Sequence, residues 1–270
     1  MPAAVIPVTG INEGFVGNIS NEGYPLRIPR NVRTADTYSI SFGESLVLNS
    51  DNTYSSVKQL IANMLAATAG SGGLFQPNVG IYAGGNPLGI AVANVKTNTT
   101  PTGFLTNGAA NVTSGYFLPG TTCDALVKGT IDVAVINGTP SGAGAGIYIA
   151  TAVDTSIPAR VVGGFEAVTD PDYATTTATA ASGATALTVA SATGIVAGMV
   201  VSGAGISTGT LVQSVSGTTV NLTSATTAAL STTSVTFSHN ILLQNIVWKT
   251  GKYTSTVGIA QATIITQQLP

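Results

Sequence analysis

Charged residues are scarce in this chain, and their scarcity excludes some classes of protein. Only 7% of its 270 residues are Asp, Glu, Lys or Arg, whereas ordinary soluble domains have about a quarter. The formal net charge of −2 and a pI near 5.2 leave no basic stripe for a nucleic acid. We therefore expect no nucleic-acid partner. The surface should stay wet through hydroxyl and amide groups, which a protein partner can cover without desolvating many charges.

Long apolar runs are also missing, although the mean hydropathy is +0.40. A membrane-spanning helix needs about 20 consecutive apolar residues, and the most apolar stretch, residues 194–206, is interrupted by Gly and Ser. The N-terminal residues 1–5 have no basic segment followed by an apolar core, so we expect no secretory signal. These patterns predict no membrane partner and synthesis in the cytoplasm.

Residues for catalysis or metal binding are few. The single Cys123 cannot form an internal disulfide or a cysteine zinc site, and we predict that it is a small buried hydrophobe. The single His239 has no recognisable nucleophile or acid beside it in the sequence, so a structural role is predicted. Asp170-Pro171-Asp172 is typical of a turn and lacks calcium-loop spacing. The sequence thus predicts that the chain is not an enzyme and has no cofactor or metal.

What is abundant is Thr, Ser, Gly, Ala and Val in short alternating runs separated by Gly, Pro, Asn and Ser turns. This pattern predicts an all-β fold, a jelly-roll-like barrel or sandwich. Asn137-Gly138 is a strong turn signal. Strands are expected at residues 38–42, 89–93, 131–135 and 147–149, and later in the chain at 186–189, 199–201, 211–215, 219–222 and 235–237.

One segment has helical spacing instead. Between Tyr54 and Thr68, apolar residues recur every three to four positions, which predicts one short amphipathic helix that covers the β structure. Gly70 is placed to end it. The apolar positions are Val57, Leu60, Ile61, Met64 and Leu65, and the candidate N-caps are Asp51, Ser55 and Ser56.

The pattern divides the chain into three parts. Residues 1–35 carry four prolines and little alternation, and they are predicted to form an extended N-terminal arm. Residues 36–173 plus 238–270 are predicted to form a core β-barrel domain. Residues 174–237 would be an inserted small β domain, because charge is absent from Tyr173 to Trp248 while β-branched residues alternate. A disordered linker is the alternative for this insert.

The arm contains Arg27, Arg30 and Arg33, with no acidic residue between Glu22 and Asp36. Two interpretations are open. The three arginines can be part of a solvated loop, or they can lie on a partner and pair with its carboxylates.

Several stretches resemble the tailed-bacteriophage capsid cement (head decoration) protein family. They are residues 89–97, 116–120 and 123–133, followed by 137–140, 147–149 and 245–251. The resemblance covers residues 14–165 and 241–270 and does not include the insert. Within the insert, residues 183–189 and 194–199 resemble a small β repeat found in head and tail components of phages.

The resemblance implies a virion protein, made in the host cytoplasm, whose core barrel sits on the outer capsid surface. Its partner would be the major capsid protein, and it would act as a homotrimer that bridges capsid subunits at local threefold positions. Arg27, Arg30 and Arg33 become candidates for the capsid contact. The alternative is a phage tail or fibre component with a surface- or glycan-binding β module. A polysaccharide hydrolase is disfavoured because sugar cleavage needs two carboxylates and acids are rare here.

Overall fold

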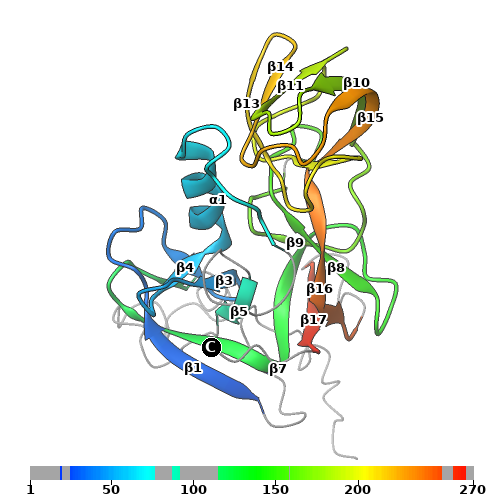
Figure 1. The fold of residues 1–270 in the computed structure, drawn as a ribbon. Coiled ribbons are helices and arrows are strands. Elements are labelled where there is room, and N and C mark those ends of the chain that lie inside the picture. The colour runs from blue at the N-terminus through cyan, green and yellow to red at the C-terminus, as the bar shows by residue number, and fades with distance from the viewer. Residues whose placement is uncertain are drawn as a thin grey trace, which may run out of the picture.

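The computed structural model describes residue 19 and residues 25–76, 87–91, 115–157, 159–250 and 258–265. Within these ranges the chain forms many strands and one helix, so the predicted all-β, barrel- or sandwich-like fold with one short helix is confirmed (Figure 1). The described part of the chain includes no helix with the length and apolarity needed to cross a membrane.

The elements follow one another in three groups. The first group is β1 (Leu26–Asn31), β2 (Ile40–Ser41), β3 (Ser45–Leu48), β4 (Tyr54–Ser56), α1 (Val57–Ala66), β5 (Pro87–Ala91), β6 (Tyr116–Phe117), β7 (Thr122–Asn137), β8 (Gly146–Ala150) and β9 (Phe165–Glu166). The second group is β10 (Ala174–Ala180), β11 (Ala186–Val189), β12 (Val200–Ser202), β13 (Val212–Ser216), β14 (Thr219–Leu222) and β15 (Leu230–Ser238). The chain then returns through β16 (Asn240–Trp248) and β17 (Ile259–Ile264).

The long strand β7 is shared by two rings of paired strands. Its second half belongs to the ring β7–β17–β16–β8–β9, in which β9 pairs back to β7. Its first half belongs to the ring β1–β7–β5–β3–β4, which a bridge between Val32 and Tyr54 closes. Each ring encloses its own apolar cluster: Trp248 lies in the first and Tyr54 in the second. The predicted strands at 131–135 and 147–149 lie within β7 and β8.

Gly129 lies where β7 changes partner. Residues up to Lys128 pair with β1, and residues from Gly129 onward pair with β17. Its φ of +123° is rarely adopted by other residues, and an added Cβ would lie 3.2 Å from Pro25. A glycine here therefore lets one continuous strand bend from one ring into the other.

The predicted helix is present as α1, and its first turn is capped by Ser56, whose side chain accepts a hydrogen bond from the Gln59 amide (3.1 Å). Its buried face includes Val57, Ile61 and Met64 and packs on the core of the first ring. The helix ends at Ala66, before the predicted stop at Gly70, and the Gln213 side chain donates hydrogen bonds to the carbonyls of Leu65 and Ala67.

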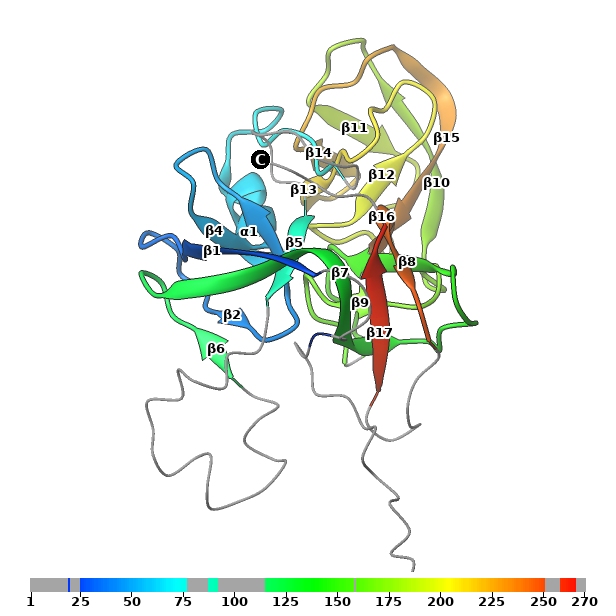
Figure 2. The ribbon, with the colours of Figure 1, turned by 90° about the horizontal axis from the view of Figure 1, so that it is seen from below.

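Residues 174–238 form a separate six-stranded sheet, called here the module, in the order β12-β15-β10-β11-β14-β13. It has its own apolar cluster, which includes Leu187, Val220 and Phe237. The predicted strands at 186–189 and 219–222 coincide with β11 and β14. In Figures 1 and 2 the module lies beside α1.

The segment that follows α1 runs along the module. Gly70 and Gly73 donate backbone hydrogen bonds to Leu222 and Thr223, and Phe75 donates to Gly209 (2.7 Å). Phe75 is fully buried and belongs to the core of the first ring. The module is thus hydrogen-bonded to the rest of the protein along this segment as well as through its two chain connections.

Two sequence predictions need correction at their boundaries. The extended arm was expected to reach residue 35, but β1 pairs with β7 over Leu26–Asn31, and Val32 is buried. The end of the arm therefore belongs to the core sheet, because its apolar residues Leu26 and Ile28 pack on the second ring. The strand expected at 38–42 is only Ile40–Ser41. Residues 1–18, 20–24 and 92–93 lie outside the described residues.

Candidate functional site

The three arginines predicted to contact a partner lie on or just after β1 and have different surroundings. Arg27 is exposed. Arg30 donates a hydrogen bond to Asn52 (3.2 Å) and is half-buried. Arg33 forms an ion pair with Asp51, with Nε and Oδ2 3.4 Å apart. Two of the three therefore have partners within the chain, Arg33 in an ion pair that is itself partly exposed, and Arg27 is exposed.

The strongest concentration of buried charge is elsewhere, around Arg160. Its side chain is fully buried and forms a bidentate ion pair with Glu166, with Nε 2.6 Å from Oε1 and Nη2 3.1 Å from Oε2. Its Nη1 also lies 3.1 Å from both Asp154 and Asp170. One guanidinium thus binds three carboxylates, and we call these residues together with His239 and Asn240 the Arg160 cluster.

His239 and Asn240 join the cluster from the start of β16. Asp170 Oδ2 accepts a hydrogen bond from the His239 backbone amide (2.7 Å) and lies 2.8 Å from the ring Nδ1. A carboxylate only accepts hydrogen bonds, so Nδ1 carries the proton. The Asn240 side chain donates to Glu166 and to the carbonyl of Val168. Hydrogen bonds and ion pairs therefore connect the loop between β8 and β9 with both ends of the module.

These contacts favour the ionised forms of two of the cluster's acids, Asp154 and Asp170. Burial works to raise the pKa of Asp170, but hydrogen bonds from His239 and the charge of Arg160 outweigh it and hold that pKa well below its usual range. Partial burial also works to raise the pKa of Asp154, but hydrogen bonds from Ser156 and nearby positive charge outweigh it and lower that pKa. Asp154 and Asp170 are thus held charged and serve as fixed partners for Arg160.

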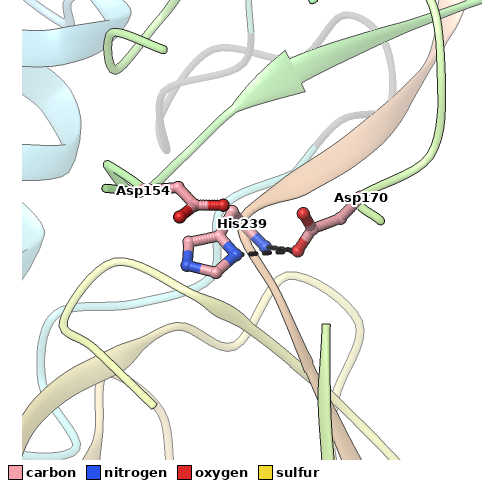
Figure 3. A group of neighbouring side chains, drawn as sticks. All are labelled: Asp154, Asp170 and His239. Carbon is pink, nitrogen blue, oxygen red and sulfur yellow. Dashed lines mark hydrogen bonds and ion pairs between the residues drawn. The ribbon is translucent and has the colours of Figure 1, made fainter. Parts of the chain in front are cut away.

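Asp154, Asp170 and His239 are also close enough to be considered as metal ligands (Figure 3). One ligand atom from each lies within 4.8 Å of the others. However, Arg160 already bonds to both carboxylates, and Asp170 is bonded to His239. A cation would have to displace a buried guanidinium. The geometry therefore describes an internal ion cluster, and we assign no metal to it.

Beside the Arg160 cluster lies a groove of about 550 Å³ between the core and the module, called here the junction groove. Tyr148, Tyr173 and Leu242 line it from the core side, and β12 with the segment that follows lines it from the module. Asp170 and Asn240 also line it, so the cluster borders the groove. A groove of this size is within the range of small-molecule sites.

The sequence singled out His239 and Asp170 separately but did not predict that they touch. They are 69 positions apart, and the module lies between them in the chain. A signal was present: charges are rare in this protein, yet Asp154, Arg160, Glu166, Asp170 and Asp172 fall within residues 154–172. Such a concentration in a chain with so few charges indicates an internal ion network. Cys123, as predicted, is buried and free.

Comparisons with family models and with curated sequences found no relative of this chain. No protein-family model matches this chain, and no curated protein sequence matches it. By its architecture the chain is an all-β protein with a double-ring core and an uncharged six-stranded module.

Proposed function

We propose that this chain is a structural virion protein, a capsid cement protein that binds the outer surface of a phage head and bridges major capsid protein subunits. The resemblance of residues 89–97 and 116–133 to that family supports the proposal, and the all-β fold agrees with it. In this proposal the chain acts mechanically, without catalysis, cofactor, nucleic acid or membrane.

The observation that carries the proposal is the uncharged surface of the module. The chain has no Asp, Glu, Lys or Arg from Tyr173 to Trp248, and this stretch folds into six strands with an apolar core of its own. A folded unit without charge has little mutual repulsion and tends to associate. That property is a liability for a free monomer and suits a protein held at high local density on a particle.

The mechanism would be the burial of surface between neighbouring capsid subunits. A contact of about 1,600 Å² has a gross apolar term of tens of kcal/mol at about 25 cal/mol per Å². Most of it is offset by lost freedom and by ordering. A homotrimer at a local threefold position multiplies the remaining contact energy, so that each copy opposes separation of the shell.

The copy number per virion tests the proposal. We expect quantitative mass spectrometry of purified particles to give a count comparable to that of the major capsid protein. A count far below that of the capsid protein would favour the alternative, in which the chain is a component of the tail or of a fibre. Absence from the particle would refute a virion role.

The capsid contact can be tested at Arg27, because its charge is exposed while Arg30 and Arg33 are engaged internally. We expect Arg27→Glu to weaken binding to undecorated capsids by about ten-fold, since a reversed charge repels a carboxylate partner. Lys58→Glu on α1 is the control for charge reversal at a different exposed cation, one whose Nζ lies 4.2 Å from the centroid of the Tyr38 ring. If Arg27→Glu bound capsids as tightly as Lys58→Glu does, Arg27 would not be part of the capsid contact.

A further inference from the structure

The junction groove has two walls from parts of the chain that are far apart in sequence. Its core wall comes from β8, β16 and the turn before β10, and its module wall from β12, β15 and the turn after β12. The Arg160 cluster holds the two chain connections at one end of the groove. The walls are thus positioned by the fold and by buried ion pairs, as a binding site requires.

The floor of the groove is apolar and partly aromatic. Tyr148 and Leu242 face each other on the paired strands β8 and β16, and both point away from the ring interior that Ile147 and Leu243 fill. Leu242 is 41% exposed, and Tyr173, at the edge, is 58% exposed. Large apolar side chains left uncovered in a concave site are typical of a surface that a ligand covers.

The polar groups of the groove are mostly uncharged hydroxyls. Ser202, Thr208, Thr236 and Ser238 line the module side, and the hydroxyls of Ser202, Thr236 and Ser238 are hydrogen-bonded within the chain. In the part of the chain that the structure describes, the hydroxyls of Tyr148, Tyr173 and Thr208 have no hydrogen-bond partner. They are therefore available to donate to and accept from a ligand.

The described residues that line the groove offer no free charge. Among them Asp170 is the one charged side chain, and both of its oxygens are used by Arg160 and His239. The Asn240 amide nitrogen is likewise used by Glu166 and Val168. An anionic or cationic ligand would lose its hydration here and gain no opposite charge. The lining thus selects for a neutral ligand.

We propose that the junction groove binds a neutral saccharide. A sugar ring has an apolar C–H face that stacks on aromatic rings such as those of Tyr148 and Tyr173, and a rim of hydroxyls that pairs with the free hydroxyls of Thr208 and the two tyrosines. A peptide with charged residues fits the lining less well. The proposal is independent of the capsid role, because a head, tail or fibre protein could each carry such a site.

The test is binding of the full-length chain to an array of immobilised oligosaccharides. The array should contain neutral members built from hexoses, 6-deoxyhexoses and N-acetylhexosamines, together with sialylated and sulfated ones. We expect binding to neutral members. Tyr173→Ala should weaken it by about ten-fold, since it removes a stacking ring. Thr208→Trp, which places bulk at the groove, should also reduce it.

Tyr116→Ala is the matched control, because Tyr116 is equally exposed (60%) and does not line the groove. It should bind as the parent chain does, and thermal melting should show all variants folded. No binding to any neutral member, binding confined to acidic members, or binding unchanged in both Tyr173→Ala and Thr208→Trp would overturn the proposal. A crystal structure with a second copy of the chain seated in the groove would also overturn it. None of these outcomes bears on the copy number per virion.

Discussion

At the scale of residues, the protein buries a few of its scarce charges together. Arg160, Glu166 and Asp170 are buried, and they satisfy one another. Removing one member of such a cluster should destabilise the fold strongly, because it leaves an unpaired charge in the interior. The sequence showed the individual residues but not the cluster, since charge pairing across 69 positions depends on the path of the chain.

The lowered pKa of Asp170 predicts a loss of stability in acid. Its folded pKa lies below the unfolded value of 3.8. Its contribution is therefore fully present above that value and is lost as the pH falls further, because the unfolded state takes up the proton first. We expect the free energy of unfolding, measured by urea titration, to fall between about pH 5 and about pH 3, and to fall less in Asp170→Asn.

Glu44→Gln provides a comparison of opposite sign. Burial raises the pKa of Glu44, outweighing a hydrogen bond from Ser41. Protonation of Glu44 thus favours the folded state as the pH falls, and the parent chain gains some stability from it. The variant lacks that gain, so its stability should fall more steeply with acid than that of the parent chain. If both variants had the same pH slope as the parent chain, the two assignments would be wrong.

At the scale of elements, β7 organises the core. It runs through both rings, and Gly129 lets it bend between them. The helix and most strands were predictable, because they follow local periodicities of about 3.6 and 2. The pairing of β1 with β7 was not, since a proline-rich segment has weak alternation and its partner strand lies about 100 positions away.

Truncations of the N-terminal segment test the role of β1. Deleting residues 1–33 removes β1 and Val32, and with them the pairing along Leu26–Asn31 and one closure of the second ring. We expect this variant to lose cooperative thermal unfolding, monitored by circular dichroism. Deleting residues 1–18 is the control and should leave the melting transition in place. A cooperative transition in the longer truncation would show that β1 is dispensable for the core.

At the scale of the whole molecule, the Arg160 cluster holds the place where the chain enters and leaves the module. Asp170 precedes β10 and His239 follows β15, while Arg160 and Glu166 belong to the core. The segment after α1 provides a second attachment through Gly70, Gly73 and Phe75. The module is therefore fixed to the core at two separate places.

Removing the central cation should weaken the whole protein. Arg160→Met leaves three carboxylates without their partner, so we expect a loss of about 3–5 kcal/mol in the free energy of unfolding. The fluorescence of the single, fully buried Trp248 follows unfolding in urea. Arg27→Met is the control, because an exposed arginine should change stability by no more than about 0.5 kcal/mol. Equal midpoints for the two variants would contradict a central role for Arg160.

By itself the sequence determined the all-β class, the one helix and most strands of the uncharged module, because composition and short-range periodicity act locally along the chain. Only the tertiary structure decided the double ring around β7, the inclusion of β1 in the core sheet, and the meeting of Arg160, Asp170 and His239 beside a groove. These features join residues tens of positions apart, and strand partners and buried ion pairs are chosen by how the whole chain packs.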